Sequence, residues 1–123
     1  MDKDRGGEAQ PGQPYVTLDG SMVTELVRPE RGGSRNLSVA EAVIEPGQRA
    51  LRHAHRESDE VYYVLGGKGE VSVGEKSFPV EPGSCLFIPA GEPHSAAAAG
   101  NGPLKILCAC APPYAHEDTI PVD

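Results

Sequence analysis

Short runs of alternating apolar and polar residues, divided by glycine and proline, extend along most of the chain. Val71 and Val73 alternate with Glu70 and Ser72, and Gly74 then marks a turn. Successive side chains of a strand point to opposite faces, so this two-residue period predicts a β-strand. Runs of β-branched and aromatic residues bounded by turn residues predict further strands at 15–18, 22–27, 37–44, 60–65, 77–80, 85–88 and 104–110. No segment predicts a convincing helix.

Lys105 indicates which face of the last of these strands points inward. Its charged side chain should lie in solvent, which places the neighbouring even-numbered positions on the inner face: Leu104, Ile106, Cys108 and Cys110. Applied to strands that begin at residues 60 and 94, the same alternation predicts a pocket lined by Tyr62, Val64, Ala96, Ala98, Ile106, Cys108 and Cys110. Two interpretations stay open for Tyr62 and the cysteines, which either fill the interior or contact a substrate.

The opposite face of segment 60–65 is also apolar. Val61, Tyr63 and Leu65 point away from the pocket by the same alternation. An apolar outer face predicts packing against a second sheet or a partner subunit, and the strands within 15–27 could complete the fold or cross to that subunit. We therefore expect a homodimer.

The composition predicts a single all-β domain preceded by a tail. With 123 residues, 15 glycines, 12 prolines and no tryptophan, the chain has room for one core and many tight turns. Residues 1–14 hold prolines, glycines and charges but hardly any apolar side chain, which predicts a disordered tail. The domain is therefore expected at 15–123.

Charge and the remaining composition argue against several classes of partner. The formal net charge of −7 and the lack of a basic run disfavour a nucleic acid or an anionic membrane. No stretch approaches the ~20 apolar residues of a membrane helix, and residues 1–7 lead into no apolar signal-peptide core. A cytoplasmic location is expected. Cys108 and Cys110 are expected to be free thiols, because an i, i+2 pair on a strand is poorly placed for a disulfide.

Three of the four histidines belong to a pattern that suits metal binding. His53 and His55 are two positions apart, so on a strand their imidazoles share one face, with α-carbons about 6.6 Å apart. Glu60 follows a polar turn at 56–59, and His94 comes from a distant part of the chain. Imidazole nitrogens and carboxylates are typical ligands of borderline divalent metals, so these four residues are predicted to bind one ion. His116 has no such support and is interpreted as part of a structural tail.

Two stretches that contain these residues resemble the two signature motifs of the cupin superfamily. The first stretch, residues 47–67, matches the motif at its fixed positions: Gly47, His53, His55, Glu60 and Gly67. The second stretch, residues 83–98, matches at Gly83, Pro89, Gly91 and His94. It departs from the motif at its end, where Ala98 replaces the expected asparagine. That asparagine is not normally a ligand, so the departure concerns a local hydrogen bond or turn.

The resemblance implies both a fold and a ligand set. The fold would be a small antiparallel β-barrel, which is a jelly roll or double-stranded β-helix, and the metal ligands would be His53, His55, Glu60 and His94. The run at 108–114 is also similar to small, single-domain bacterial cupins. The resemblance therefore indicates the site more closely than the substrate.

The ligand set is compatible with three kinds of function. Three neutral imidazoles and one carboxylate leave a divalent ion with a net charge of about +1 and, if it is six-coordinate, two neighbouring open positions. Our leading hypothesis is a metal-dependent oxygenase acting on a small oxygen-rich metabolite, with Fe or Mn favoured and Zn, Ni or Cu possible. The first alternative is a redox-neutral isomerase, cyclase or lyase in which Glu60 or Tyr62 moves a proton. The second is a non-catalytic barrel that senses or stores a small ligand.

Overall fold

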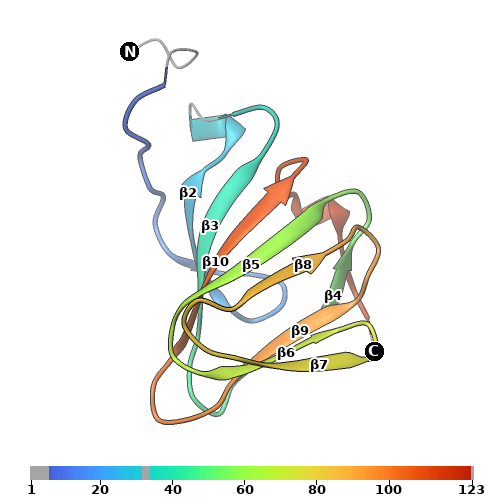
Figure 1. Cartoon of the computed structure of the whole chain (residues 1–123). Helices are drawn as coiled ribbons and strands as arrows, with labels where there is room; N and C mark the ends of the chain where they lie inside the picture. The colour runs from blue at the N-terminus through green and yellow to red at the C-terminus, as the bar shows by residue number, and fades with distance from the viewer. Residues whose placement is uncertain (1–5, 32–33, 123) are drawn as a thin grey trace.

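The computed structural model describes residues 6–31 and 34–122, and within them the chain forms two antiparallel sheets that face each other (Figure 1). The first sheet has the order β1-β2-β3-β10-β5-β8. Its strands are β1 (Tyr15–Val16), β2 (Met22–Val27), β3 (Ser38–Ile44), β10 (Leu104–Ala111), β5 (Asp59–Gly66) and β8 (Cys85–Ile88). The second sheet has the order β11-β4-β9-β6-β7. Its strands are β11 (Thr119–Pro121), β4 (Arg49–His55), β9 (His94–Ala98), β6 (Gly69–Val73) and β7 (Lys76–Val80).

The hydrophobic core lies between the two sheets and follows the alternation seen in the sequence. In β5 Tyr62 and Val64 are buried, whereas Tyr63 and Leu65 are 43% and 44% exposed. In β10 the side chains of Leu104, Ile106 and Cys110 are buried and Lys105 is exposed. The expected facing of these strands is confirmed, and so is the all-β, jelly-roll class of fold.

The two N-terminal strands complete the first sheet of their own chain. β2 pairs with β3, with Met22 opposite Val43, and β1 pairs back on β2. β1 is shorter than the expected strand at 15–18 because the chain already turns at Thr17, whose backbone exchanges hydrogen bonds with Gly20 and Ser21. Residues 6–14 form no helix or strand and residues 1–5 lie outside the described part, so the disorder of 1–14 stays a prediction.

The C-terminal segment differs from expectation. The strand at 104–110 was expected to be the last, but β11 follows it and pairs with β4, with Thr119 opposite His55. A strand of three residues is too short to show an alternating pattern, and its existence depends on a partner far away in the sequence. The described residues contain two short 3₁₀ turns, Pro29–Arg31 and His116–Asp118, and no α-helix. Across those residues, no helix has the length and apolar character needed to cross a membrane.

A short turn between β4 and β5 brings the chain from the second sheet to the first. The expected polar turn at 56–59 is confirmed, with Asp59 already in β5. The Asp118 carboxylate accepts hydrogen bonds from the backbone N–H of Glu57 and Ser58, at 3.0 and 3.3 Å. The Ser58 hydroxyl donates to the carbonyl of Pro112 at 2.8 Å. These contacts fix the start of β5 and therefore the position of Glu60.

Gly67 is a position where this fold requires glycine, and we predict that Gly67→Ala is strongly destabilising. Its φ of +79° is strained for other residues, and a Cβ would collide with the carbonyl oxygen of Pro103. We expect the free energy of unfolding in urea to fall by about 2–4 kcal/mol. Gly83 is the matched control, because its φ is +95° but a Cβ there meets nothing within 4 Å. Gly83→Ala should cost about 1 kcal/mol; equal losses in the two variants would contradict the collision.

Candidate metal centre

The structure brings His53, His55, Glu60 and His94 together in one buried cluster. One ligand atom from each residue lies within 4.8 Å of the others. Two histidines come from β4, the third begins β9, and the glutamate enters from β5 in the opposite sheet. The strand register places His53 directly opposite His94, with ring centroids 4.3 Å apart. Their exposed fractions run from 0% for His94 to 6% for Glu60, so the donors are shielded from bulk water.

The outer nitrogen of each imidazole has its own hydrogen-bond partner. Nδ1 of His53 lies 2.7 Å from the Leu51 carbonyl oxygen, and Nδ1 of His94 lies 3.0 Å from that of Glu92. Carbonyl oxygens accept only, so both Nδ1 atoms carry the proton. Nδ1 of His55 lies 3.1 Å from the Thr119 hydroxyl oxygen, which itself donates to the Ala115 carbonyl and can accept from the ring. Each histidine therefore presents the lone pair of Nε2 to the centre of the cluster, as metal ligation requires.

The carboxylate of Glu60 completes the donor set. Its Oε1 lies 3.2 Å from Nε2 of His55 and 3.1 Å from Nε2 of His94. Burial alone raises the pKa of Glu60, but His55 and His94 outweigh it when their Nε2 atoms carry a proton beside Oε1, and they lower that pKa to about 2; a bound cation would take the place of those protons. Burial lowers the pKa of His53. An ionised carboxylate and three imidazole lone pairs that converge in a buried space fit a divalent cation.

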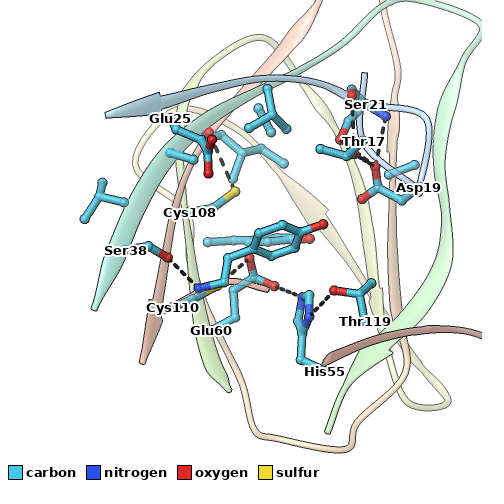
Figure 2. Close-up of a pocket in the computed structure, with 18 of the residues that line it drawn as sticks. Thr17, Asp19, Ser21, Glu25, Ser38, His55, Glu60, Cys108, Cys110 and Thr119 are labelled. Atoms are coloured by element: carbon cyan, nitrogen blue, oxygen red, sulfur yellow. Dashed lines mark hydrogen bonds and ion pairs between the residues drawn. The ribbon is translucent and has the colours of Figure 1, made fainter. Parts of the chain in front are cut away.

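The cluster opens into a cavity between the two sheets (Figure 2). The volume open to the centres of water-sized molecules is about 60 Å³, enough for on the order of five waters. Of the residues expected to line a pocket, four lie along this cavity: Tyr62, Ile106, Cys108 and Cys110. The other three expected lining residues, Val64, Ala96 and Ala98, are not among its lining residues.

Those three side chains serve the core instead of the cavity. Val64 and Ala96 belong to the buried hydrophobic cluster, and Ala98 packs against it. Alternation predicts which face of a strand a residue occupies, but not whether the space between the sheets is open or filled at that point along the strand. Around these three residues the space is filled, because the two sheets are in contact through side chains. The cavity extends instead toward β1 and β2, so its lining along β5 ends at Tyr62.

Burial, together with the charge of Glu60, keeps the phenol and the two thiols of the cavity protonated. Burial and the charge of Glu60 raise the pKa of Tyr62 well above its usual range. The same two causes raise the pKa of Cys108 and Cys110, and the Cys110 thiol donates to Oε2 of Glu60 at 3.4 Å. Since the thiolate is the reactive form of cysteine, these thiols are weak nucleophiles and would serve as hydrogen-bond donors.

The N-terminal hairpin forms a wall of the cavity that the sequence interpretation missed. Every second residue from Tyr15 to Val27 lines the cavity: Tyr15, Thr17, Asp19, Ser21, Val23, Glu25 and Val27. This two-residue period continues through the segment between the strands expected at 15–18 and 22–27. No hydrophobic pattern marks this wall: Val16, Leu18 and Met22 are apolar yet exposed, so alternation would have assigned the opposite face of the hairpin to the interior.

The C-terminal segment also contributes to the site, through residues other than its histidine. Thr119 holds the His55 ring, and both Thr119 and Tyr114 line the cavity. His116 is exposed, and its Nδ1 lies 2.9 Å from the Tyr114 hydroxyl, outside the four-residue cluster.

A two-sheet jelly roll with three inward histidines and one carboxylate defines a metal-binding class of β-barrel. Residues 40–110 match the cupin domain, so the chain belongs to the cupin family. An uncharacterised protein of Methanocaldococcus jannaschii is 43% identical over 107 residues, which cover 87% of this chain and 86% of that protein. An oxalate-binding protein of Thermotoga maritima is 34% identical over 112 residues, which cover 78% of this chain and 93% of that protein. A Thermotoga maritima crystal structure described as a predicted oxalate decarboxylase aligns with a TM-score of 0.71 and 26% identity. The alignment covers 85% of this chain and 93% of that one.

We predict that Glu60→Gln weakens metal binding while the fold persists. The amide has nearly the same shape as the carboxylate but lacks its charge, and the hydrophobic core does not depend on an ion. Affinity for Zn²⁺, measured by calorimetry on protein prepared with a chelator and then dialysed, should fall by at least about 100-fold. The matched control is His116→Gln, which changes a histidine outside the cluster. An unfolded Glu60→Gln variant, or equal affinity in both variants, would contradict the assignment.

Proposed function

We propose that this cupin is a metal-dependent enzyme that acts on a small, oxygen-rich metabolite, and that its reaction is an oxygenation. The observation that carries the proposal is the arrangement of three imidazole lone pairs and one carboxylate beside a small cavity, which His53, His55 and Glu60 line. A divalent ion held there, with Fe or Mn favoured, would supply Lewis acidity and neighbouring positions for a substrate oxygen and for O₂. The small cavity favours a substrate of low molecular mass.

The residues of the cavity wall divide into two groups that suit such a substrate. Apolar side chains from β2 and β3 cover the side away from the cluster: Val23, Val27, Val39, Ala40, Ala42 and Ile44. They exclude water and accommodate an apolar molecule such as O₂. Polar groups lie beside the cluster, where Tyr62, kept protonated by burial and by Glu60, can donate a hydrogen bond to a substrate oxygen.

A redox-neutral isomerase, cyclase or lyase is the second candidate, and the placement of Tyr62 favours it. The Tyr62 ring lies 5.7 Å from the ring of His94, so a protonated phenol stands beside the ligand cluster. Such a group can deliver a proton to a substrate carbanion or enolate without any change in oxidation state. The Thermotoga maritima structure adds support, because a decarboxylase is a lyase. The oxalate-binding relative supports the third candidate, a barrel that binds without turnover.

Metal analysis followed by turnover with and without O₂ separates these candidates. The protein is purified without chelators, its metals are quantified, and small hydroxy-ketones, hydroxy-acids and dicarboxylates are supplied in air and under argon. We expect product formation only in air, with O₂ consumed in proportion to substrate, and its loss in Glu60→Gln. Tyr62→Phe should lower turnover by about 10-fold or more if the phenol supplies a proton. Equal turnover under argon would favour the redox-neutral candidate, and binding without turnover would favour the third.

We also propose that the protein is a homodimer that associates through the outer face of β5 and β8. Tyr63, Leu65 and Phe87 are exposed there by 43%, 44% and 61%, and Val61 lies opposite Phe87 in the strand register. Exposed aromatic and aliphatic side chains in adjacent strands are typical of a protein interface.

Leu65→Glu is predicted to dissociate this dimer. A charge on the outer face would have to be buried in the interface, so the variant should sediment as a monomer at concentrations where the wild type is dimeric. Leu51→Glu is the matched control, because Leu51 is also exposed, at 57%, but lies on β4 in the other sheet. Removal of residues 1–14 should leave the dimer intact. A wild-type protein that stays monomeric at all concentrations would rule the proposal out.

A further inference from the structure

We propose that Asp19 is a substrate-selecting residue of the metal centre, which favours an uncharged, hydroxyl-bearing ligand and disfavours anions such as oxalate. The inference rests on the proposed function, because it concerns the ligand that binds beside the metal. Asp19 lies outside the matched cupin domain, in the hairpin between β1 and β2.

The Asp19 carboxylate is held rigidly by its own hairpin. Its Oδ1 accepts hydrogen bonds from the hydroxyls of Thr17 and Ser21, at 2.5 and 2.6 Å, and from the backbone N–H of Ser21 at 2.9 Å. The backbone carbonyl of Asp19 accepts a hydrogen bond from the Leu51 N–H at 2.6 Å, which ties the hairpin to β4 beside His53. Figure 2 shows Asp19, Thr17 and Ser21 grouped together, with Glu25 on the opposite side of the view.

The second oxygen of this carboxylate faces the metal cluster. Oδ2 lies 3.6 Å from Nε2 of His53, and the Asp19 side chain is 13% exposed. Among the described residues no hydrogen-bond donor lies within bonding distance of Oδ2. Asp19 is not a member of the cluster whose ligand atoms all lie within 4.8 Å of one another. This placement suits an acceptor for an O–H group of a ligand that occupies the open side of the metal, rather than a further metal ligand.

The other polar groups of the cavity favour the same class of ligand. Two unpaired carboxylates, from Asp19 and Glu60, lie beside the cluster, whereas the third carboxylate of the lining, Glu25, is paired with Arg28; among the described residues that line the cavity there is no lysine or arginine. The hydroxyls of Thr17 and Ser21 already donate to Asp19, and the Cys110 thiol donates to Glu60. Tyr62 can donate one hydrogen bond to a ligand, whereas Oδ2 of Asp19 can only accept one, so the site favours a ligand with an O–H group and little negative charge, such as a small hydroxy-ketone or polyol.

Oxalate fails this requirement although a relative of this chain is an oxalate-binding protein. A dianion on the open side of the metal would place its oxygens against Oδ2 of Asp19, with no cationic side chain in the lining to offset the repulsion. It also offers no O–H group to that acceptor. The same carboxylate therefore attracts one class of ligand and repels the other.

Asp19→Asn tests the inference, because the substitution keeps the shape of the side chain and changes its charge and hydrogen bonding. The amide oxygen can still accept from Thr17 and Ser21, while an N–H donor replaces the Oδ2 acceptor and the charge is lost. We compare two ligands with the same number of non-hydrogen atoms, oxalate and dihydroxyacetone. The affinity of each for Mn²⁺-loaded protein is measured, and the two ligands are then tested for competition with each other at the metal. We expect oxalate to bind about 10-fold or more tightly to the variant than to the wild type. Dihydroxyacetone should bind at least about threefold more weakly.

Glu25→Gln is the matched control, because it removes the same charge from the same cavity at a position paired with Arg28. It should change either affinity by less than about twofold. A general loss of structure would weaken the binding of both ligands. Damage to the fold therefore cannot reproduce the opposite changes in affinity that are expected for Asp19→Asn. Mn²⁺ binding with unchanged oxalate affinity in Asp19→Asn would overturn this inference alone. Failure of the wild type to bind Mn²⁺ or any other divalent metal would overturn the proposed function and this inference together.

Discussion

The register between β4 and β9 is the constraint on which the site depends. It sets His53 opposite His94. An irregularity between Ala50 and His53 shifts the register, so both side chains are buried although residues three positions apart on a regular strand would point to opposite faces. A slip of one residue in either strand would turn its ligands to the outer face, because side chains alternate. The core and the site therefore specify the same pairing, since the strand that buries Ala96 in the hydrophobic cluster also directs His94 to the ligand cluster.

Segments from both ends of the chain hold the ligands in place. The C-terminal strand β11 lies along β4 and gives Thr119 to the His55 ring, while the N-terminal hairpin is tied to β4 beside His53. The central strands supply the donor atoms, and these flanking segments control ring orientation and the space around the cluster. Such outer contacts are commonly as important for a metal site as the ligands themselves.

Local pattern in the sequence was sufficient for the all-β class and for the facing of several strands, while the resemblance to the cupin motifs supplied the jelly roll. Lys105 fixed the facing of β10, and the spacing of His53 and His55 indicated a shared strand face. The same reasoning placed Val64, Ala96 and Ala98 in the pocket. Alternation cannot distinguish the part of the barrel that side chains fill from the part that is open. Thr119 could not be found at all, since its position depends on pairing between strands more than sixty residues apart.

The hairpin that closes the cavity stands apart from the rest of the barrel in sequence. Its lining residues, from Tyr15 to Val27, precede the part that matches the cupin domain, whereas all four ligands fall inside that part. The candidate metal ligands and the hairpin that lines the cavity therefore lie in separate stretches of the chain. Replacement of that short hairpin alone would change one wall of the cavity while leaving the strands that carry the four candidate ligands untouched.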